Sequence, residues 1–319
     1  MTKKDIKTTK DRVLKKILIG IYQYPNSLKS AIYGIDDTLK IANKVCRDQV
    51  VEIQFEPIIL DNTSAFKKKL SLLILPPSCE GDYYLHPQED LLNWIQVLHS
   101  QGTIIGSVCA GSFILAASGL IQDRSVTTHW NLSDAFQKHF PEIALNTNEI
   151  IIDNGDIITA GGMFSWLDLC LELIAKYTSM NVMRELGKTL VVDTARRYQR
   201  FYQQFNPTML HGDQSIVMVQ QWMNMRYRKT LTVQSLAKYA NFTERTLQRR
   251  FMKATGYSPN QYLQRLRVQK ACDLLENSND SFDSIANQVG YDDSSACRKV
   301  FIKTMGLTPR EFRARFVRE

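Results

Sequence analysis

The chain has 319 residues, of which 44% are hydrophobic and 23% charged, and its formal net charge is +8. This composition excludes a disordered or fibrous chain, and the length predicts about two domains. Residues 214–319 hold 18 Lys and Arg against 9 Asp and Glu, a net charge of +9, whereas residues 1–213 hold 22 against 23, a net charge of −1. The basic excess indicates a polyanion-binding module attached to a neutral domain, although charge alone leaves a solvated basic face as the alternative.

The N-terminus and the cysteines favour a reducing compartment. Residues 1–12 are expected to be a tail, and the apolar run at 17–21 is too short for the core of a signal peptide. The run of eighteen uncharged residues at 104–121 is long enough for a membrane-spanning helix. Its glycines and serines favour a strand, a turn and a helix instead. Six scattered cysteines without a C-x-x-C motif predict neither disulfides nor a metal site. We therefore expect a cytoplasmic protein without a membrane partner, metal or cofactor.

Residues 13–180 alternate apolar runs with amphipathic stretches. Strands are predicted at 17–22, 51–55, 72–75, 104–108 and 157–159, and helices at 35–45, 89–101, 110–118, 132–139 and 165–178. This order predicts an α/β domain with a mostly parallel sheet covered on both faces. Residues 180–204, with Gly187 as the one breaker, are predicted to extend this domain (13–204) as a helix, before a linker at 205–213 and an all-α domain at 214–319.

The stretch from Ile104 to Ser112 is an apolar strand followed by Cys109 and small residues that open a helix. This pattern is typical of a nucleophile elbow, and the start of a helix favours the thiolate form of Cys109. His129 follows a short strand at Val126, and a Cys and a His from adjacent strand ends can act as nucleophile and base. Most such pairs in a sequence never touch, so the pair alone does not predict catalysis.

The wider pattern around Cys109 and His129 resembles a known family. It comprises Gly106, Cys109, Gly111, Leu115-Ala116, Gly119-Leu120-Ile121, Thr127-Thr128-His129-Trp130, Phe140-Pro141, Asp153, Gly155, Thr159-Ala160-Gly161-Gly162 and Leu167-Asp168-Leu169. This set is similar to the PfpI/ThiJ branch of the class I glutamine amidotransferase-like superfamily, and more narrowly to the GlxA-like regulators fused to AraC-type domains. The resemblance implies a flavodoxin-like fold that forms a homodimer and holds a small-molecule pocket beside the elbow.

Enzymes of this superfamily carry an acid that orients the His, and this chain departs from them. The loop from Tyr24 to Lys29 has no acid, and Asn131 follows Trp130. Pro77 has no N–H to stabilise an oxyanion, although Ser78 could still donate one. We expect a ligand-sensing relic of the elbow rather than an enzyme. The alternatives are a thiol-dependent hydrolase or lyase with an autoregulatory DNA-binding domain, and a purely dimerising domain.

The candidate ligand-binding residues are Ser78, Cys109, Ala110, His129, Trp130 and Phe164. By resemblance, the effector would be an amino acid, a quaternary amine such as betaine or carnitine, or a related nitrogen metabolite. Trp130, Phe164 and Trp166 could form an aromatic site for a cationic amine. We favour the core for these three residues, because aromatic side chains dominate protein cores.

Two stretches of the C-terminal domain, fifty residues apart, repeat each other. Residues 251–265 and 301–315 both fit F-x-K-x-x-G-x-[ST]-P-x-x-[YF]-x-x-R. In each, the Phe ends the core face of a helix, the Gly supplies a left-handed cap and Ser/Thr-Pro starts the next helix. The repeat predicts two helix-turn-helix units, which one amphipathic helix at 260–275 would join.

Each unit leaves a polar face on its second helix. In the first unit, Leu247 and Phe251 pin the helix that follows Thr243; in the second, Cys297 and Phe301 pin a helix at 294–305. The predicted DNA-binding residues are Arg245, Gln248 and Arg249 in the first unit and Ser295, Ala296, Arg298 and Lys299 in the second. Arg pairs with guanine and Gln with adenine in the major groove, and Arg also binds phosphate.

These residues belong to a pattern that resembles the AraC/XylS-type DNA-binding domain over 214–317. The pattern comprises Leu236-Ala237, Arg245, Leu247, Arg249, Phe251, Gly256, Ser258-Pro259, Ile285-Ala286, Gly290-Tyr291, Phe301, Gly306 and Thr308-Pro309. The resemblance implies a transcription activator that binds double-stranded promoter DNA and acts with RNA polymerase. Cys297 departs from the family's bulky apolar residue, so we expect looser packing and less sequence specificity in the second unit. A helical bundle that binds no nucleic acid is the alternative.

Overall fold

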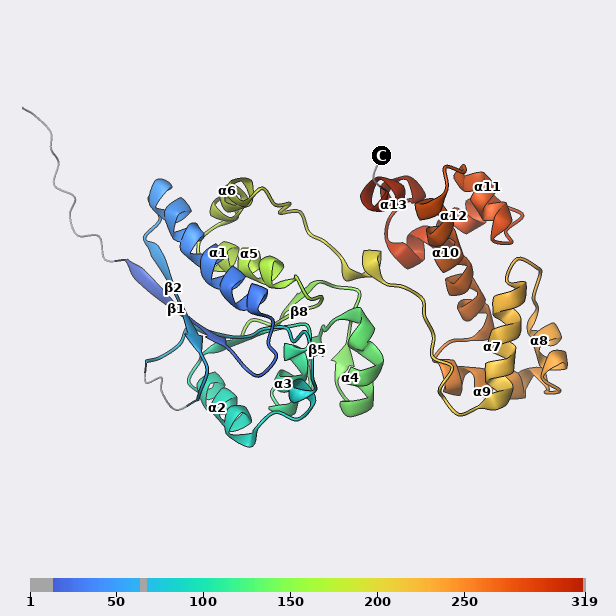
Figure 1. The fold of residues 1–319 in the computed structure, drawn as a ribbon, viewed down its shortest axis with the longest axis horizontal. Coiled ribbons are helices and arrows are strands. Elements are labelled where there is room, and N and C mark those ends of the chain that lie inside the picture. The colour runs from blue at the N-terminus through green and yellow to red at the C-terminus, as the bar shows by residue number, and fades with distance from the viewer. Residues whose placement is uncertain (1–13, 64–67, 318–319) are drawn as a thin grey trace, which may run out of the picture. The chain divides into compact units, whose positions relative to one another are not determined.

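The computed structural model describes residues 14–63 and 68–317. The chain divides into two compact units, unit 1 ending at Gln199 and unit 2 beginning at Arg200 (Figure 1). The boundary between the units therefore lies on the N-terminal side of the linker predicted at 205–213. The predicted tail at 1–12 lies outside the described residues.

Unit 1 is built on a six-stranded sheet in the order β2-β1-β3-β4-β8-β7. Its strands are β1 (Lys15–Tyr22), β2 (Ile53–Leu60), β3 (Leu72–Leu75), β4 (Ile104–Val108), β7 (Ile151–Asp153) and β8 (Ile157–Ala160), and a separate pair is formed by β5 (Ser125–Val126) and β6 (Ala144–Leu145). All neighbours in the sheet are parallel except β7, which is antiparallel to β8. The predicted mostly parallel sheet is confirmed.

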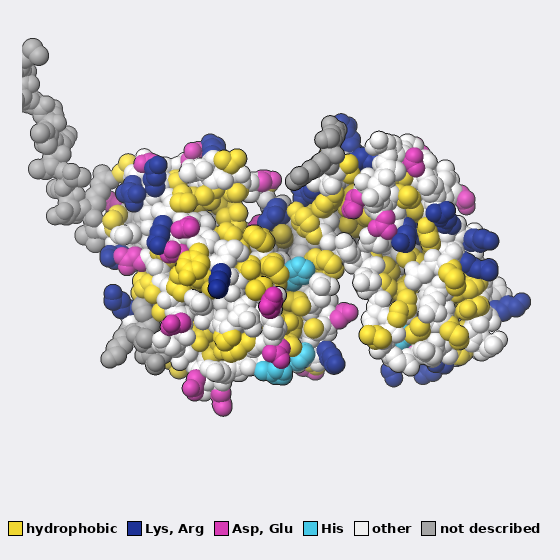
Figure 2. All heavy atoms as spheres, in the orientation of Figure 1, with side chains coloured by type: hydrophobic (Ala, Val, Ile, Leu, Met, Phe, Trp, Pro, Cys, Tyr) yellow, Lys and Arg dark blue, Asp and Glu magenta, His cyan; other side chains and the backbone are white. Residues whose placement is uncertain are grey.

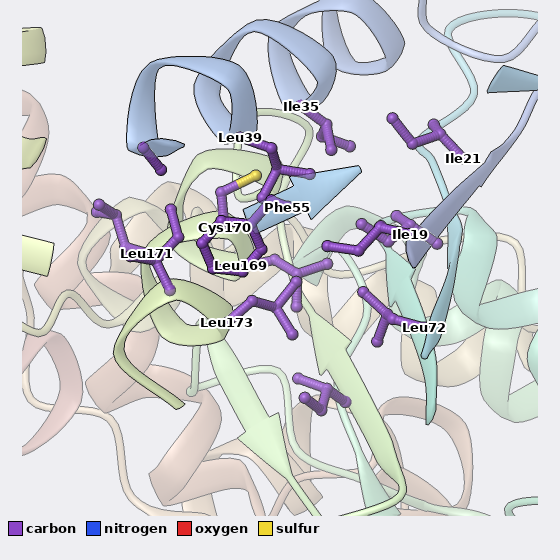
Figure 3. Packing of buried hydrophobic residues seen from close by; sticks show 14 of the residues in the cluster. Ile19, Ile21, Ile35, Leu39, Phe55, Leu72, Leu169, Cys170, Leu171 and Leu173 are labelled. Atoms are coloured by element: carbon purple, nitrogen blue, oxygen red, sulfur yellow. The ribbon is translucent and has the colours of Figure 1, made fainter. Parts of the chain in front are cut away.

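Helices cover both faces of the sheet (Figure 1). One face carries α1 (Lys29–Asp48), α5 (Trp166–Tyr177) and α6 (Met180–Leu190), and the other carries α2 (Glu89–Ser100), α3 (Gly111–Ala117) and α4 (Ser133–His139), with short turns η1 (Tyr83–Leu85) and η2 (Trp130–Leu132). Alternate residues of β3 face opposite ways, so Leu72 and Ile74 join one core cluster while Leu73 and Leu75 join the other. Figure 3 shows the first cluster, in which Leu39 and Leu169 face Ile19.

The predicted helix over 180–204 is wrong, because α6 ends at Leu190. Val191 takes a left-handed conformation with φ 56°, and the chain then folds back along the helix. A Cβ atom at Gly187 would lie 2.1 Å from Thr194 Cγ2, so this glycine admits the returning chain. The next helical turn is η3 (Gln199–Tyr202), which spans the boundary between the units.

Unit 2 is built from helices, as predicted. They are α7 (Gln214–Arg226), α8 (Val233–Tyr239), α9 (Glu244–Thr255), α10 (Pro259–Asn277), α11 (Phe282–Gln288), α12 (Ser294–Met305) and α13 (Pro309–Phe316). The helix α10 contributes Leu263 and Leu266 to a core with α7, α8 and α9, and Val268 and Leu275 to a core with α11, α12 and α13. One helix thus joins the two helix-turn-helix units, as the sequence predicts.

Residues 104–121 form β4, the turn at Cys109 and α3 with its following turn, rather than one long helix. Over residues 14–63 and 68–317, no helix is both long and apolar enough to cross a membrane.

Candidate functional site

Cys109 lies on a sharp turn between β4 and α3, and this confirms the predicted elbow. Its φ is 54°, in the left-handed region that a non-glycine residue rarely adopts. The Cys109 N–H donates to the Ala160 carbonyl at 2.8 Å, and Thr128 Oγ1 donates to the Cys109 carbonyl at 2.7 Å. A Cβ atom at Gly111 would lie 2.4 Å from the Leu75 carbonyl oxygen, so only glycine lets α3 start this close to β3.

The Cys109 thiol is not activated. Burial raises the pKa of Cys109 to about 12, and the side chain is only 3% exposed, like the adjacent Ala110 at 2%. The expectation that the helix start favours the thiolate is therefore wrong, because loss of solvation outweighs the backbone N–H of Ala110 that lowers the pKa. The thiol is neutral at physiological pH.

His129 is not held as a general base. Its Nδ1 accepts the N–H of Asn131 at 3.0 Å, where it caps η2. In a neutral imidazole only one nitrogen carries the proton, so Nδ1 as acceptor leaves the proton on Nε2. Burial also lowers the pKa of His129, which favours this neutral ring. The ring nitrogen that is free for other partners is therefore a donor.

The elbow lies near the topological switch point of the sheet. There the chain passes from β1 to β2 on one side of β1 and then crosses to β3 on its other side. Ligands of open α/β sheets bind at such points, outside the carboxyl ends of the strands. The two loops there are tied together, because Tyr24 Oη donates to the Pro76 carbonyl at 2.5 Å and Ser27 pairs with Ser78. Ser78 Oγ lies 3.1 Å from the Asn26 carbonyl and 2.8 Å from that of Glu80, so its hydroxyl is engaged within the loops.

The aromatic candidates form two pairs. The rings of His129 and Trp130 lie 5.4 Å apart, and those of Phe164 and Trp166 lie 6.3 Å apart. Phe164 is 62% exposed, so the expectation that it belongs to the core is wrong, and Trp130 and Trp166 are partly buried. His129, Trp130 and Phe164 follow β5 and β8, whereas Trp166 starts α5 and packs against the core cluster beside α1, where a Cβ atom at Gly34 would lie 2.5 Å from its ring.

Sequence reasoning missed Gln199, the last residue of unit 1. Its side chain is 2% exposed, and its Oε1 accepts the N–H of Trp130 at 2.7 Å. Its Nε2 lies 3.0 Å from the carbonyl oxygens of Thr128 and Thr147, and 3.3 Å from that of Glu149. We call this set of partners the Gln199 socket. Its partners lie 50 to 71 residues away in the chain, which no local pattern could show.

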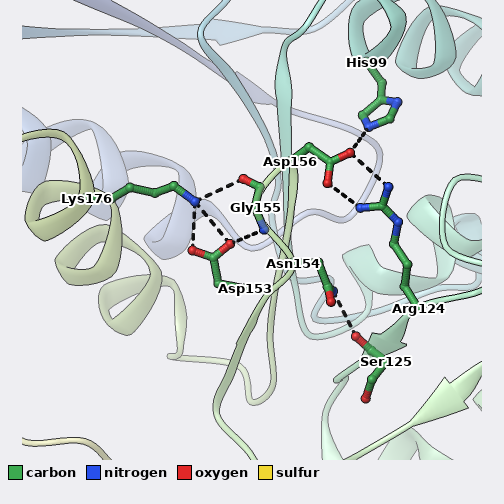
Figure 4. Close-up of polar contacts among 8 residues, drawn as sticks. All are labelled: His99, Arg124, Ser125, Asp153, Asn154, Gly155, Asp156 and Lys176. Atoms are coloured by element: carbon green, nitrogen blue, oxygen red, sulfur yellow. Dashed lines mark hydrogen bonds and ion pairs between the residues drawn. The ribbon is translucent and has the colours of Figure 1, made fainter.

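At the other end of the sheet a polar cluster ties the turn between β7 and β8 to α2, to α5 and to the residue before β5 (Figure 4). Arg124 binds both carboxylate oxygens of Asp156, and His99 Nε2 lies 2.8 Å from one of them. Arg124, followed by His99, lowers the pKa of Asp156 well below its usual range. Lys176 binds Asp153 and the Gly155 carbonyl beside it. This cluster closes the turn between β7 and β8 and is structural.

The repeat in unit 2 is confirmed in its geometry. Gly256 and Gly306 cap α9 and α12 with φ 74° and 73°, and Ser258 and Thr308 cap the next helices in the same way. The paired core rings also repeat, since Phe251 meets Tyr262 at 5.2 Å and Phe301 meets Phe312 at 5.7 Å, both edge to face. Each unit therefore presents a second helix, α9 or α12, on an equivalent anchor.

The predicted DNA-binding faces are accessible. Arg245, Gln248 and Arg249 are exposed on α9, while Leu247 is buried. On α12, Ser295, Arg298 and Lys299 are exposed and Ala296 is half-buried. Arg298 lies over the Phe282 ring at 4.9 Å and 3.6 Å from Asp283 Oδ1, so it is partly engaged within unit 2.

A pocket of about 590 Å³ lies beside α9. Arg249 and Lys253 line it together with the backbone at Gly212. On its other side Arg250 binds both oxygens of Asp213, at 2.9 and 2.6 Å, and lies over the Phe242 ring at 4.5 Å. Arg250 therefore fixes α9 to the start of α7, and leaves Arg249 and Lys253 as the exposed cations of the pocket.

Family comparisons divide the chain in the same way. The DJ-1/PfpI family matches residues 42–176, and a helix-turn-helix domain matches residues 236–315. Two solved structures are similar. An AraC family transcriptional regulator from Pseudomonas putida is 16% identical and covers 55% of this chain and 99% of its own, with a TM-score of 0.47. The DNA-binding domain of AdpA in complex with a target DNA is 33% identical and covers 32% and 92%, with a TM-score of 0.31.

Three curated relatives are transcriptional regulators. GbdR of Pseudomonas aeruginosa is 26% identical over 70% of this chain and 60% of its own length. CdhR of the same organism is 28% identical over 70% and 67%, and GlxA of Rhizobium meliloti is 26% identical over 67% and 66%. The match thus spans about 60% of the first of these relatives. The chain combines a DJ-1/PfpI domain with an AraC-type helix-turn-helix domain, the architecture of these AraC-family regulators.

Proposed function

We propose that the chain is a sequence-specific DNA-binding transcription regulator whose unit 1 binds a small effector. One observation carries the DNA-binding half: α9 and α12 repeat the same cap, core anchor and exposed polar face. Two exposed helices of this kind can read two successive major-groove segments, which lie about 34 Å apart on one face of DNA. The net charge of +9 in residues 214–319 supplies the attraction to phosphates, and Figure 2 shows Lys and Arg side chains on the surface of unit 2.

The residues divide by chemistry. Arg245, Gln248 and Arg249 offer the donors that read guanine and adenine edges, whereas Ser295 and Lys299 on α12 offer fewer base-specific groups. Arg298 is partly engaged by Asp283 and Phe282. We therefore assign more of the sequence specificity to the first unit and more of the phosphate positioning to the second.

A salt titration tests the DNA-binding half. The double variant Arg249→Ala with Lys299→Ala should weaken binding to a duplex selected by the full chain, and its salt slope should fall by about 0.9 for each phosphate that the variant no longer neutralises. The double variant Lys40→Ala with Lys188→Ala removes the same charge from exposed sites of unit 1 and should change neither quantity. An unchanged slope in the first variant would contradict this assignment of the two faces.

We place the effector at the elbow. The switch point favours a ligand there, and the thiol of Cys109 and the ring of His129 are both neutral. The exposed Phe164 and the partly buried Trp130 and Trp166 suit a cationic amine, in keeping with an amino acid or quaternary amine effector. A thermal-shift screen of amino acids and quaternary amines tests this, because a ligand of the folded state raises the unfolding temperature. The shift should vanish in Trp130→Ala, and a shift that survives there would place the ligand elsewhere.

We propose that unit 1 is not an enzyme. Thiol chemistry needs a thiolate and a base, but Cys109 is a neutral thiol and His129 presents a donor at Nε2. The relatives with this architecture are transcriptional regulators. The hydrolase or lyase alternative is tested with Cys109→Ala. Turnover of a small ester, amide or aldehyde that the wild type supports and this variant loses would overturn the sensor-only function.

We further propose that two chains pair through unit 1 and that the DNA-bound dimer activates RNA polymerase in the cytoplasm. The resemblance of unit 1 to dimeric family members supports pairing, and the six unpaired cysteines suit a reducing compartment. Sedimentation of the full chain tests the dimer, and transcription in vitro from a template carrying the selected duplex tests activation. A monomer at micromolar concentration, or repression of that template, would contradict these two assignments.

A further inference from the structure

The Gln199 socket gives a structural role to residues of two sequence motifs, Thr127-Thr128-His129-Trp130 and Thr159-Ala160-Gly161-Gly162. Thr128 connects the elbow to the socket, since its Oγ1 donates to the Cys109 carbonyl and its own carbonyl accepts from Gln199 Nε2. Gly161 makes room for the amide, because a Cβ atom there would lie 2.3 Å from Gln199 Nε2 and 2.8 Å from the Thr128 carbonyl oxygen. The residues that frame the elbow are therefore shaped around a side chain from the end of unit 1.

The residues that follow Gln199 belong to unit 2, where 200–205 form a strap along the helices. Phe205 packs its ring against Tyr262 at 5.1 Å and Tyr257 at 5.7 Å, and its N–H donates to Gln269 Oε1 at 2.8 Å. Tyr202 meets the Phe316 ring at 5.5 Å. The strap thus contacts both helix-turn-helix units, one at each end.

Phe201 fills a position at which the repeat is broken. In the first unit Arg265 lies over the Tyr257 ring at 4.9 Å. In the second unit the equivalent arginine is Arg315, and Leu307 replaces Tyr257. Arg315 lies over the Phe201 ring instead, at 5.1 Å. Phe201 is 6% exposed, so the strap supplies the aromatic ring that the second unit lacks.

Arg200 lies at the end of the second recognition helix. Gly306 caps α12, and a Cβ atom there would lie 2.3 Å from Arg200 Nε. A cation at a helix C-terminus interacts favourably with the unpaired carbonyls of the last turn. A movement of Arg200 therefore acts directly on the helix that carries Ser295 and Lys299.

We propose that Gln199 is the positioning residue that couples the effector site to the DNA-reading surface. Its side chain is held beside the elbow and His129-Trp130, and the next two residues are held at the cap of α12 and under Arg315. Because Gln199 and Arg200 are adjacent, the chain has no slack between the two anchors. An effector that alters the segment from Thr128 to Trp130, between β5 and η2, alters the Gln199 bonds, and the strap transmits this change to α12.

This inference rests on the proposed function, and reciprocity allows a test without the effector. If effector binding alters the affinity for DNA, DNA binding must alter the affinity for the effector by the same factor, so the effector site must respond to DNA. The probe is a duplex of about 30 base pairs selected from a random pool by the full chain, long enough for two major-groove segments about 34 Å apart. The readout is hydrogen exchange of the amides at 127–130, because the Trp130 N–H is itself bound to Gln199.

In the full-length wild type, saturating duplex should change exchange at 127–130 by roughly five-fold or more, the lower end of typical allosteric coupling. The change should be lost in Gln199→Leu and kept in Gln204→Leu, a matched exchange of an exposed glutamine in the same strap. A second variant inserts Gly-Ser-Gly-Ser between Gln199 and Arg200. It leaves both anchors intact but adds slack, so it should bind the duplex and lose the response.

A wild type that binds the duplex without any change at 127–130 would overturn the coupling and leave the proposed DNA-binding function standing. A response that persists in the insertion variant would also overturn it. If Gln199→Leu loses protection across unit 1 without DNA, that variant has unfolded and the insertion variant decides alone. If no duplex from the pool binds, the proposed function fails, and the coupling fails with it.

Discussion

Gly161 and Gln199 fit together so closely that a Cβ atom on the glycine would lie 2.3 Å from the Gln199 amide nitrogen. Gly161→Ala should therefore push Gln199 from its socket and destabilise unit 1 by about 1–3 kcal/mol, the usual cost of overpacking. Urea unfolding of unit 1, followed by hydrogen exchange at 127–130, measures this. Gly106→Ala is the matched control, since the nearest atom there lies at an ordinary 3.5 Å and the cost should stay below about 1 kcal/mol. Equal stabilities of the two variants would contradict the close fit.

Cys109 should react far more slowly than Cys79. The pKa of Cys109 is raised to about 12, so roughly one part in ten thousand is thiolate at pH 8. Cys79 is exposed, whereas the other five cysteines are buried. Iodoacetamide labelling followed by peptide mass spectrometry should show Cys79 labelled at least about 100-fold faster than Cys109. Rapid labelling of Cys109 in the Cys79→Ala variant would show that the elbow thiol is activated after all.

Acidification should destabilise unit 1 through His129. Burial lowers the pKa of His129 in the folded chain, so the folded state resists protonation. The stabilising contribution is present above about pH 6.5, the value in the unfolded chain, and is lost as the pH falls through the lower folded value. His129→Asn keeps a capping side chain and should reduce the loss of stability between pH 7.5 and 5.5 by on the order of 1 kcal/mol. Thermal unfolding at the two pH values measures it, and an unchanged difference would assign the pH dependence elsewhere.

Asp156 should stabilise the turn between β7 and β8 in its charged form. Asp156→Asn weakens the pairing with Arg124 and His99 and should cost about 1 kcal/mol at pH 7, because the side chain is 45% exposed and solvent screens the pair. The pKa is lowered in the fold, so the contribution exists above about pH 4 and fades as the pH falls toward the folded value. The difference in unfolding free energy should shrink near pH 3. The exposed Asp90, changed to Asn, serves as the control.

Neighbouring arginines on α9 should behave differently toward DNA. Arg249 is exposed at the pocket, whereas Arg250 is bound to Asp213 and stacked on Phe242. Arg249→Ala should reduce the salt slope of DNA binding by about 0.9, and Arg250→Ala should destabilise unit 2 while leaving that slope unchanged. Titrations at four salt concentrations separate the two outcomes. A reduced slope in Arg250→Ala would mean that this side chain also reaches a phosphate.

The sequence predicts the helix-turn-helix units well because their signals are local. The cap at Gly256 and the core face of Leu247 and Phe251 lie within a few residues of each other, so spacing alone defines the helix and its exposed side. Local signals also predict the turn at Cys109. They fail where distant residues decide the outcome. The pKa of Cys109 depends on burial by the whole domain, and Gln199 depends on partners brought together by the sheet.

The same limit explains why the helix predicted at 180–204 is wrong, whereas β6 and β7 escape prediction because they are short. Gly187 is tolerated within α6 because Thr194 folds back against it, a contact that hydrophobic periodicity does not show. The strands β6 and β7 have only two and three residues, too few for an alternating pattern.

The strap at 200–205 sets the smallest fragment in which unit 2 can be studied alone. A fragment that begins at Gln214, where the basic composition starts, would remove the Phe205 ring from Tyr262 and leave Arg315 without Phe201. Such a fragment would expose a largely buried aromatic surface and invite aggregation. Phe205, which the sequence places in the linker, and Phe201, which it places in the first domain, thus both pack on unit 2, and domain exchanges between relatives should join the two units between Gln199 and Arg200 rather than beyond them.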